Sequence, residues 1–588
     1  MALRASLLEV HINKCYTLSM NKKKIPYAVS NLEQIRSGNY YFVDKTKYLE
    51  KLENYITPVF LRPRRFGKTL WCSIQECYYD INRKEKFTEL FGDTYIGKNP
   101  TPEQGEYMVL RLNFSSVQVS EDKEKIEHNF NFISGSSFGL FCKYYKNLLV
   151  NYYFDEKESI TNKLSSLFRY IQENNLPPIY LIIDEYDNFT NQLITSNNDS
   201  LYKTLTSDNS FFKTFFKKLK EGTESGVVKR VFITGVLPIT IDDLSSGFNI
   251  AEIITLREPF ASMLGFTQGE VDIYLENVFN DYKFNKELTA PVSKIIKNYY
   301  NGYQFAEGAE ALYNSTIITY FLKLFVTENG VIPPFFIDTN LKTDVSWIRR
   351  LTLKESNTKE MLETILLTSE LEYDSVQLTE KFNMNQFFQP DFYPVSLFYL
   401  GMLTVKDSYS MKIPNQTMQA IFTEYFNEVE NFNVSYKYSE IFKQFLKDMD
   451  LKNLFKGYWD IYISQFPAQM FDKANENFFR STFYELCRRH LSQHFAFEIE
   501  INRHSGRADW ELLGKPTSPY KNIKYLAEFK HFTAKDKKVF EGLTAGRLED
   551  IKQIKQYGDE IKEEFPYYTI THWLIYTFSG REWKVFKV

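Results

Sequence analysis

Cysteine is scarce in this chain, and its positions form no pattern. The 588 residues include 5 cysteines, an odd number, and no two of them form a CxxC pair. This spacing argues against both a disulfide framework and a cysteine metal site. We expect buried, reduced thiols at these positions, which are Cys15, Cys72, Cys77, Cys142 and Cys487.

Long apolar runs are also absent. A helix that crosses a membrane needs about 20 consecutive apolar residues, and the most apolar segment, Pro394 to Val405, is too short. The first residues lack a basic head followed by an apolar stretch, which argues against a secretory signal. We therefore expect a cytoplasmic protein that does not associate with a membrane.

An excess of one charge is missing as well. The formal net charge is −3 and the pI about 6.3, so contact with nucleic acid would need a local basic patch. Histidine spacing gives no indication of zinc. Aromatic residues are abundant, with 52 Phe and 41 Tyr, and the chain is longer than one hydrophobic core usually serves. Two or more well-packed domains are expected.

Short apolar runs alternate with helical patterns over residues 25–275, which predicts a parallel sheet flanked by helices. The run Ile179 to Ile183 has no polar alternation, as is typical of a strand buried on both faces, and we place it at the sheet centre. The other predicted strands of this region are Pro58 to Leu61, Met108 to Phe114 and Arg230 to Gly235.

The remaining chain divides into a helical lid over 276–345, a helical and winged-helix-like region over 346–465, and a second α/β domain over 466–588. Residues 1–24 form an N-terminal extension. A hairpin is expected where Met402 to Val405 and Met411 to Ile413 flank a polar turn. The strands predicted in the last domain are Phe497 to Ile501, Ala508 to Leu512, Lys524 to Phe529 and Trp573 to Phe578.

The segment RPRRFGKT, residues 62–69, follows a predicted strand and opens a predicted helix, as a phosphate-binding loop requires. Backbone N–H groups around Arg65, Phe66 and Gly67 can cradle phosphate oxygens. Lys68 can meet the β and γ phosphates, and the Thr69 hydroxyl can bind Mg²⁺. Arg62 replaces the first glycine of the usual motif, so a basic loop before a helix is the alternative interpretation.

A second acidic element strengthens the first interpretation. The buried strand that ends at Ile183 runs directly into Asp184 and Glu185, in the manner of a Walker B motif. Asp184 would hold Mg²⁺, and Glu185 would polarise the attacking water. Thr234 ends another strand, where a polar residue can sense the γ-phosphate. The alternative for the acidic pair is an exposed strand end.

These motifs resemble the successive blocks of the predicted AAA-ATPase-like family. The resemblance implies an AAA-like core that binds ATP, followed by a lid and a winged-helix-like region. Pro238 departs from the family pattern, which has a polar or basic residue there, and Arg257 is only a weak substitute for a sensor arginine. Asp44 and Lys45 lie either near the nucleotide or in a solvated turn. The matching blocks, all read in this sequence, are 42–46, 62–69, 183–187, 232–236, 264–267, 300–303, 313–314, 399–404 and 413–415.

A second constellation lies near the C-terminus. Asp509 stands near the start of one predicted strand, and Glu528 and Lys530 end the next. Because alternate residues of a strand share a face, two carboxylates and one ammonium can converge. The carboxylates can hold Mg²⁺ or Mn²⁺, and Lys530 can orient a water that attacks a phosphodiester.

This arrangement resembles the PD-(D/E)xK nuclease superfamily over about the last 110 residues. The resemblance implies a restriction-endonuclease-like fold, with Glu485 as a further acidic metal ligand on the preceding helix. It also matches Gln553 and Tyr557 on the helix after the ExK strand. Each of these helix positions is otherwise a solvent-facing residue. A phosphate-binding patch or a solvated face is expected from the nearby lysines, which are Lys521, Lys524, Lys535, Lys537 and Lys538.

The sequence thus predicts an α/β multidomain ATPase that uses ATP and Mg²⁺ and carries a nuclease domain that cuts DNA or RNA. Mn²⁺ is an alternative metal at the nuclease site. The rival prediction is a nucleotide-dependent switch or scaffold whose nuclease-like domain binds without cutting. Assembly into a homo-oligomer is left open.

Overall fold

The computed structural model describes residues 22–244, 247–333, 347, 357–378, 382–435, 438–515, 518–579 and 581–588. Residues 1–21 of the predicted N-terminal extension, and parts of the predicted lid and winged-helix-like region, lie outside these ranges. The chain forms two compact units. Unit 1 comprises Met1–Thr289, Gly302–Lys323 and Tyr373–Tyr409, and unit 2 comprises Ala290–Asn301, Leu324–Glu372 and Ser410–Val588. Because neither unit is one continuous segment, the predicted linear boundaries stay predictions.

Unit 1 is built on a five-stranded sheet with the order β2-β3-β4-β1-β5, in which all neighbouring strands are parallel. The four predicted strands are confirmed, and β5 was not predicted. β3 is fully buried inside the sheet, as its apolar sequence predicts, but the middle position belongs to β4. The strands are β1 (Pro58–Leu61), β2 (Met108–Asn113), β3 (Ile179–Asp184), β4 (Val228–Gly235) and β5 (Glu252–Ile253).

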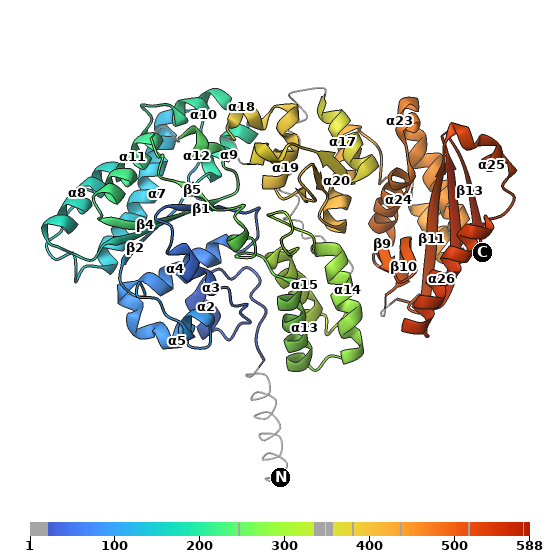
Figure 1. Ribbon diagram of the computed structural model, residues 1–588, viewed down its shortest axis with the longest axis horizontal. Helices are drawn as coiled ribbons and strands as arrows, with labels where there is room; N and C mark the ends of the chain where they lie inside the picture. Colours follow the sequence, from blue (N-terminus) through green and yellow to red (C-terminus); the bar gives the residue numbers. More distant parts are fainter. Residues whose placement is uncertain are drawn as a thin grey trace, which may run out of the picture. The chain divides into compact units, whose positions relative to one another are not determined.

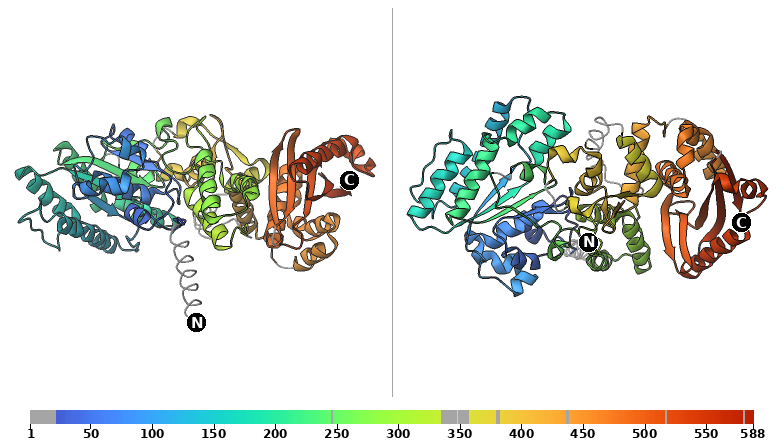
Figure 2. Two further views of the ribbon diagram at one scale, coloured as in Figure 1. Left: turned by 90° about the horizontal axis from the view of Figure 1, so that it is seen from below. Right: turned by 45° about the horizontal axis from the view of Figure 1, so that its top comes forward.

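Helices cover both faces of this sheet (Figures 1 and 2). The connection through α4 leads to β2 at one edge, whereas the connections through α7, α8 and α11 lead back across the sheet. Right-handed crossovers therefore place α4 on one face and the other three on the opposite face. Their bounds are α4 (Lys68–Tyr79), α7 (Lys123–Tyr144), α8 (Ile160–Glu173) and α11 (Phe211–Glu224).

Polar caps fix the starts of several helices. Ser159 and Ser210 accept backbone N–H groups at the starts of α8 and α11, and Thr267 forms a capping box with Glu270 at α13. The other helices and strands that begin in unit 1 are α2 (Leu32–Ser37), α3 (Lys47–Leu52), α5 (Phe87–Phe91), α6 (Tyr95–Lys98), α9 (Asn188–Thr195), α10 (Asp199–Thr206), α12 (Ile239–Asp243), α13 (Gln268–Tyr282), α14 (Thr289–Tyr300), α15 (Ser315–Thr327), α18 (Met384–Phe387), α19 (Tyr393–Tyr399) and β7 (Thr404–Val405).

Unit 2 ends in a mixed sheet with the order β13-β12-β11-β10-β9. β11 and β12 are parallel and need a crossover, which α26 supplies, and the other neighbours are antiparallel. All four predicted strands are confirmed, each longer than predicted, and β13 was not predicted. The strands are β9 (Phe495–Arg503), β10 (Gly506–Gly514), β11 (Ile523–Phe532), β12 (Thr569–Phe578) and β13 (Glu582–Lys587).

Two helices cover the two faces of the mixed sheet, α24 (Glu476–Leu491) on one and α26 (Leu548–Glu564) on the other (Figures 1 and 2). Ile554 and Tyr557 of α26 pack with Leu526 and Leu574 of the sheet in one apolar core. The remaining elements are α17 (Asn357–Thr368), β6 (Glu370–Glu372), β8 (Ser410–Lys412), α20 (Gln416–Val429), α21 (Ser439–Asp448), α22 (Leu451–Gly457), α23 (Ala468–Lys473) and α25 (Lys537–Gly542).

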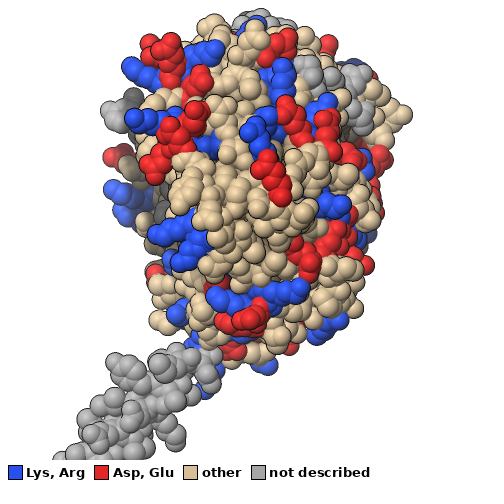
Figure 3. Space-filling view, turned by 90° about the vertical axis from the view of Figure 1, so that its left-hand side faces the viewer, with Lys and Arg blue, Asp and Glu red and all other residues tan. Residues whose placement is uncertain are grey.

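Several smaller features expected from the sequence can be compared with the described residues. The short strand β7 precedes the predicted polar turn, and the short strand β8 follows it. β8 pairs with β6, which was not predicted. The described cysteines are free thiols; Cys72, Cys77 and Cys487 are buried, whereas Cys142 is half-buried. Positive and negative side chains are interspersed on the face seen in Figure 3, in keeping with the small net charge. Within the described ranges, no helix is both long and apolar enough to span a bilayer.

Candidate nucleotide-binding and metal-binding sites

The loop between β1 and α4 has the backbone of a phosphate cradle. Helix α4 begins at Lys68, and its cap residue Gly67 has φ of +92°, a left-handed conformation that suits glycine. Arg65 is also left-handed, with φ of +70°. The ammonium of Lys68 is buried and donates to the carbonyls of Arg62 and Pro63, each at 2.9 Å, and burial lowers the pKa of Lys68. The first turn of α4 thus offers N–H groups, and the lysine folds over the loop.

Arg62, which replaces the usual glycine, is a buried clamp. Its side chain is 1% exposed, and burial lowers its pKa to about 9. The guanidinium carbon lies 3.8 Å from the centre of the Phe305 ring. This clamp joins the end of β1 to the segment after β5. Its guanidinium donates, over 2.9–3.2 Å, to the carbonyl oxygens of Leu61, Thr255, Phe260 and Ala261.

Blocks far along the chain hold the same loop. The Asn314 side-chain amide donates to the Arg64 carbonyl at 3.1 Å, while its oxygen accepts the Thr316 N–H at 3.2 Å and caps α15. The ring of Phe66 packs edge-on against Tyr303, with centroids 5.2 Å apart. These contacts give the family blocks near residues 303 and 314 a structural role in shaping the loop.

Asp184 lies at the end of β3 and is fully buried. Its Oδ2 accepts from the Arg111 guanidinium at 2.9 Å and from the Asn113 amide at 3.4 Å. Arg111 also donates to the backbone carbonyl of Thr69 at 3.3 Å, so the two predicted Mg²⁺ ligands share one arginine. Arg111 and Asn113 were not predicted, although their spacing of two on a buried strand was a usable signal.

Glu185 has the left-handed φ of +53°, which is rare for glutamate and is found where structure constrains a functional residue. Burial raises the pKa of Glu185, and the Lys68 ammonium opposes this rise. Asp187, two residues on, was not predicted as important. Its carboxylate accepts the N–H groups of Val236 and Leu237, at 3.0 and 2.8 Å, and thereby fixes the turn after β4.

Four residues considered for nucleotide contact, one predicted and three left open, have other partners in the structure. The buried hydroxyl of Thr234 donates to the Phe60 carbonyl at 2.7 Å and is committed to the sheet rather than presented to a phosphate. Asp44 is exposed and accepts the Thr46 N–H, in keeping with a solvated turn, whereas Lys45 is buried against Glu270 at 2.6 Å. Arg257 is a half-exposed partner of Glu252.

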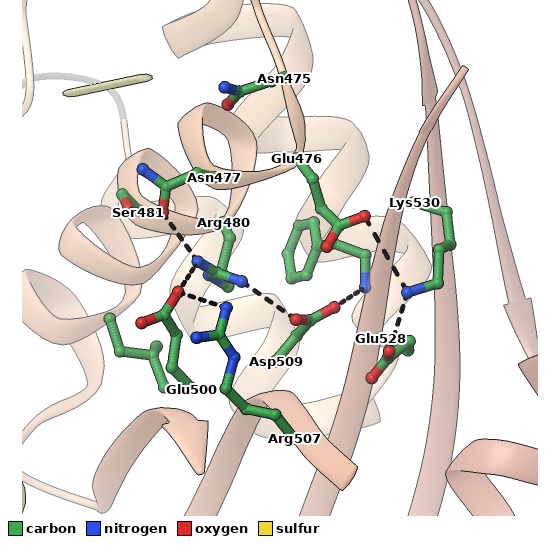
Figure 4. A network of polar contacts seen from close by, with 12 residues as sticks. Asn475, Glu476, Asn477, Arg480, Ser481, Glu500, Arg507, Asp509, Glu528 and Lys530 are labelled. Carbon is green, nitrogen blue, oxygen red and sulfur yellow. Dashed lines mark hydrogen bonds and ion pairs between the residues drawn. The ribbon is translucent and has the colours of Figure 1, made fainter. Parts of the chain in front are cut away.

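The C-terminal residues converge as predicted (Figure 4). Asp509 and Glu528 are 4% and 2% exposed, and they occupy the next positions beyond the paired residues Trp510 and Ala527. The Lys530 ammonium lies 2.9 Å from Glu528 Oε1. Asp509 Oδ2 accepts the backbone N–H of Phe529 at 2.8 Å.

Helix α24 contributes a carboxylate, but it is Glu476 rather than the predicted Glu485. Glu476 opens the helix, and its Oε2 lies 4.0 Å from the Lys530 ammonium. Nine residues correspond to two and a half turns and about 13–14 Å of helix, so Glu485 points to the other side. Glu485 instead pairs with Arg488 and Arg489. The signal for Glu476 in the sequence was an acidic residue at the start of the helix.

The cluster is electrostatically strained. Burial, together with the nearby Asp509 carboxylate, raises the pKa of Glu528 to about 7, while Lys530 opposes the rise. Burial and Asp509 also raise the pKa of Glu476. Burial lowers the pKa of Lys530, but Glu528 and Glu476 outweigh this and leave it above its usual value. Closely spaced carboxylates of this kind favour a bound cation.

The predicted lysine patch is only partly formed. Lys524 is buried, 2.7 Å from the buried carboxylate of Glu511, so it cannot contact a nucleic acid. Lys521 precedes β11 and Lys535 follows it, and a strand of 10 residues separates them by about 33 Å. Of the predicted helix pair, Gln553 donates to the Tyr557 hydroxyl at 2.6 Å, and Tyr557 is buried rather than solvent-facing.

The residues at both sites fit a divalent cation. Asp184 Oδ1 and Glu528 Oε2 are buried oxygens with no hydrogen-bond partner among the described residues. Carboxylate oxygens are the ligands that Mg²⁺ and Mn²⁺ prefer. The carboxylates do not form a ready-made cage, because no group of three or more His, Cys, Asp or Glu in the described ranges has a metal-binding arrangement.

Comparison with known proteins finds a family model over the region of each site. Residues 26–245 match the family model described as predicted AAA-ATPase, and residues 474–587 match that of the PD-(D/E)XK nuclease superfamily. The chain joins a predicted AAA-ATPase domain to a PD-(D/E)XK nuclease-superfamily domain. The AAA-ATPase domain carries the loop of Lys68 together with Asp184 and Glu185, and the nuclease-superfamily domain carries Glu476, Asp509 and the ExK strand.

Individual relatives are distant. A curated protein of Azotobacter chroococcum mcd 1, described as an uncharacterized protein in the vnfD 5' region, is 23% identical over 344 residues. The match covers 55% of this chain and 55% of that protein, so the chain spans about half the length of this relative. A solved structure titled "Structure of Drosophila ORC bound to GC-rich DNA and Cdc6" matches with a TM-score of 0.26 and 11% identity, over 76% of this chain and 61% of that chain.

Proposed function

We propose that the chain is an ATP-binding and ATP-hydrolysing protein whose nuclease-superfamily domain cuts nucleic acid with the help of a divalent metal. In the AAA-ATPase domain, the N–H groups at the start of α4 and the Lys68 ammonium would bind the phosphates. Thr69 and Asp184 would hold Mg²⁺, and Glu185 would orient the attacking water. The raised pKa of Glu185 suits a residue that accepts a proton.

In the nuclease-superfamily domain, Asp509 and Glu528 would hold Mg²⁺ or Mn²⁺, with Glu476 beside them. When bound, such a metal supplies a Lewis acid and lowers the pKa of a bound water. Lys530 would orient that water and stabilise charge on the phosphate. The polymer cut would be DNA or RNA.

One observation carries this proposal: Glu528 presents an unpartnered buried oxygen, while its other oxygen holds Lys530 at 2.9 Å. A buried charged oxygen without a partner costs several kcal/mol in a purely structural site. A metal bound to that oxygen would remove this cost.

The test is a cleavage assay on DNA and RNA with Mg²⁺, Mn²⁺ or EDTA, using the full chain. Asp509→Asn, Glu528→Gln and Lys530→Met should each lower the rate at least 100-fold and leave ATP binding intact. Glu582→Gln, an exposed acid on β13, is the matched control and should cut at the wild-type rate. Wild-type cleavage by folded Glu528→Gln protein would reject the site.

A nucleotide-dependent switch whose nuclease-like domain only binds is the second candidate. The observation in its favour is that cations already neutralise the site: Arg480 holds Asp509 at 3.0 Å and Lys530 holds Glu528. This candidate predicts nucleic-acid binding with no cleavage under any divalent metal, together with tight ATP binding and little turnover.

A further inference from the structure

Arg480 is a buried cation that the proposed reaction does not use, yet it lies within the site (Figure 4). It follows Glu476 by one helical turn on α24, so the two side chains share a helix face. Its Nη1 donates to Asp509 Oδ1 at 3.0 Å, and its Nη2 donates to Asn477 Oδ1 at 2.7 Å and pairs with Glu500. The side chain is 4% exposed. The buried arginine thus bridges Asp509, a predicted metal ligand, and Glu500, which was not predicted to bind the metal.

The strand pair is distorted where Arg480 binds. Asp509 and Glu500 lie opposite each other between the paired residues 508/501 and 510/499, and Glu500 has the left-handed φ of +53°. Ala508 packs in the core with α26, whereas Trp510 packs against Phe483 of α24. A regular strand would place positions 508 and 510 on one face. The left-handed residue therefore turns the chain beside Asp509 and aims Glu500 at Arg480.

The charges nearly balance without a metal. Four carboxylates, from Glu476, Glu500, Asp509 and Glu528, face three cations, from Arg480, Arg507 and Lys530. The formal charge of the cluster is then −1, so a divalent ion would leave it at +1. Arg480 is the cation in direct contact with Asp509, which makes it the group that opposes the ion most strongly.

We propose that Arg480 is a built-in competitor of the divalent metal at the nuclease-superfamily site. Arg480 holds one oxygen of Asp509 and releases it when the metal binds, while Glu500 and Asn477 retain the guanidinium beside the site. The inference rests on the proposed function, because it assumes that Asp509 is a metal ligand. It deepens that function by giving the site a metal-free resting state in which the charges nearly balance.

Two roles for Arg480 predict opposite changes in metal affinity. If Arg480 only orients Asp509, its removal misplaces a ligand, and the metal binds more weakly. If Arg480 competes, its removal leaves the buried Asp509 carboxylate and Glu500 with one cation fewer, and the metal binds more tightly. The expected gain is about 10-fold, the lower end of what a charge-assisted hydrogen bond contributes.

The experiment measures Mn²⁺ binding to the full chain by electron paramagnetic resonance of free Mn²⁺, without nucleotide or nucleic acid. Asp509→Asn identifies the ions that depend on this site. Arg480→Met and Arg480→Gln should both bind Mn²⁺ about 10-fold more tightly than wild type. Arg507→Met is the matched control: it removes another cation from Glu500, but its side chain is 55% exposed and should change the affinity less than about threefold.

Each outcome decides between the hypotheses. Tighter binding in the two neutral Arg480 variants, without a comparable change in Arg507→Met, supports competition. Unchanged or weaker binding in whichever Arg480 variant folds, with Asp509-dependent binding present in wild type, overturns this inference and leaves the proposed function standing. Absence of any Asp509-dependent Mn²⁺ binding in wild type overturns the proposed function and this inference with it.

Discussion

The Arg62 clamp offers a direct test of how the phosphate-binding loop is held. We expect Arg62→Met to destabilise the AAA-ATPase domain, because methionine fills much of the same apolar space but provides no donor. The guanidinium now serves four carbonyl oxygens at 2.9–3.2 Å in a place that is 1% exposed. In the variant these oxygens lose a partner that solvent cannot replace.

The size of the effect follows from two opposing contributions. A buried acceptor left without a partner costs about 1–3 kcal/mol. Removal of the buried cation offsets part of this cost, because burial already disfavours the charged guanidinium and lowers the pKa of Arg62 to about 9. Four acceptors at this cost, less the part that removal of the buried cation offsets, leave a net loss of about 3 kcal/mol.

Thermal unfolding of the full chain measures this loss. The transition of the AAA-ATPase domain is recognised because ATP shifts it, and about 3 kcal/mol should lower its Tm by about 6–12 °C. Arg257→Met is the matched control, since that arginine is half-exposed and its loss should change the Tm by less than about 2 °C. A transition of Arg62→Met within 2 °C of wild type would refute the clamp.

Three further predictions concern the two sites. Lys68→Ala should abolish tight ATP binding, whereas Glu185→Gln should bind ATP but not turn it over; equal hydrolysis by wild type and Glu185→Gln would reject the role of Glu185. Because the folded chain raises the pKa of Glu528 to about 7, the stability that protonation contributes is complete below pH 4.5 and lost as the pH rises through 7. In EDTA, Glu528→Gln should therefore be more stable than wild type at pH 8.5, by up to about 3 kcal/mol, and no more stable at pH 4.5; a difference independent of pH contradicts this. Finally, ATP should change cleavage by about 5–150-fold in either direction at fixed free Mg²⁺, and identical rates with ATP, ADP and no nucleotide would mean independent activities.

Local sequence was sufficient for the strands of the two five-stranded sheets, except β5 and β13, and for the motifs at the strand ends. The apolar run before Asp184, and the acid-x-lysine pattern of Glu528 and Lys530, depend on alternation along one strand. Such patterns do not need distant contacts, so the strands predicted from them are confirmed. The matches to two family models confirm the resemblances drawn from the same motifs.

Groups that meet through tertiary structure could not be found in this way. Arg111 reaches Asp184 because β2 happens to lie beside β3, and Asn314 reaches the loop from 250 residues away. The helix carboxylate was misassigned because a run of helical residues does not say which turn meets the sheet. Packing of α24 brings Glu476 to Lys530. Glu485 lies two and a half helical turns further on, so its side chain points away and pairs with Arg488.

What the sequence by itself determined is the chemistry available at each strand end, because residue type and alternation are local properties. What only the tertiary structure decided is which charges face one another. Thr234 is bonded within the sheet and Lys524 is paired with Glu511, although both are suitable residue types at suitable positions in the chain. The physical reason is that a polar group in a folded core must find a partner, and that partner is set by packing between distant segments.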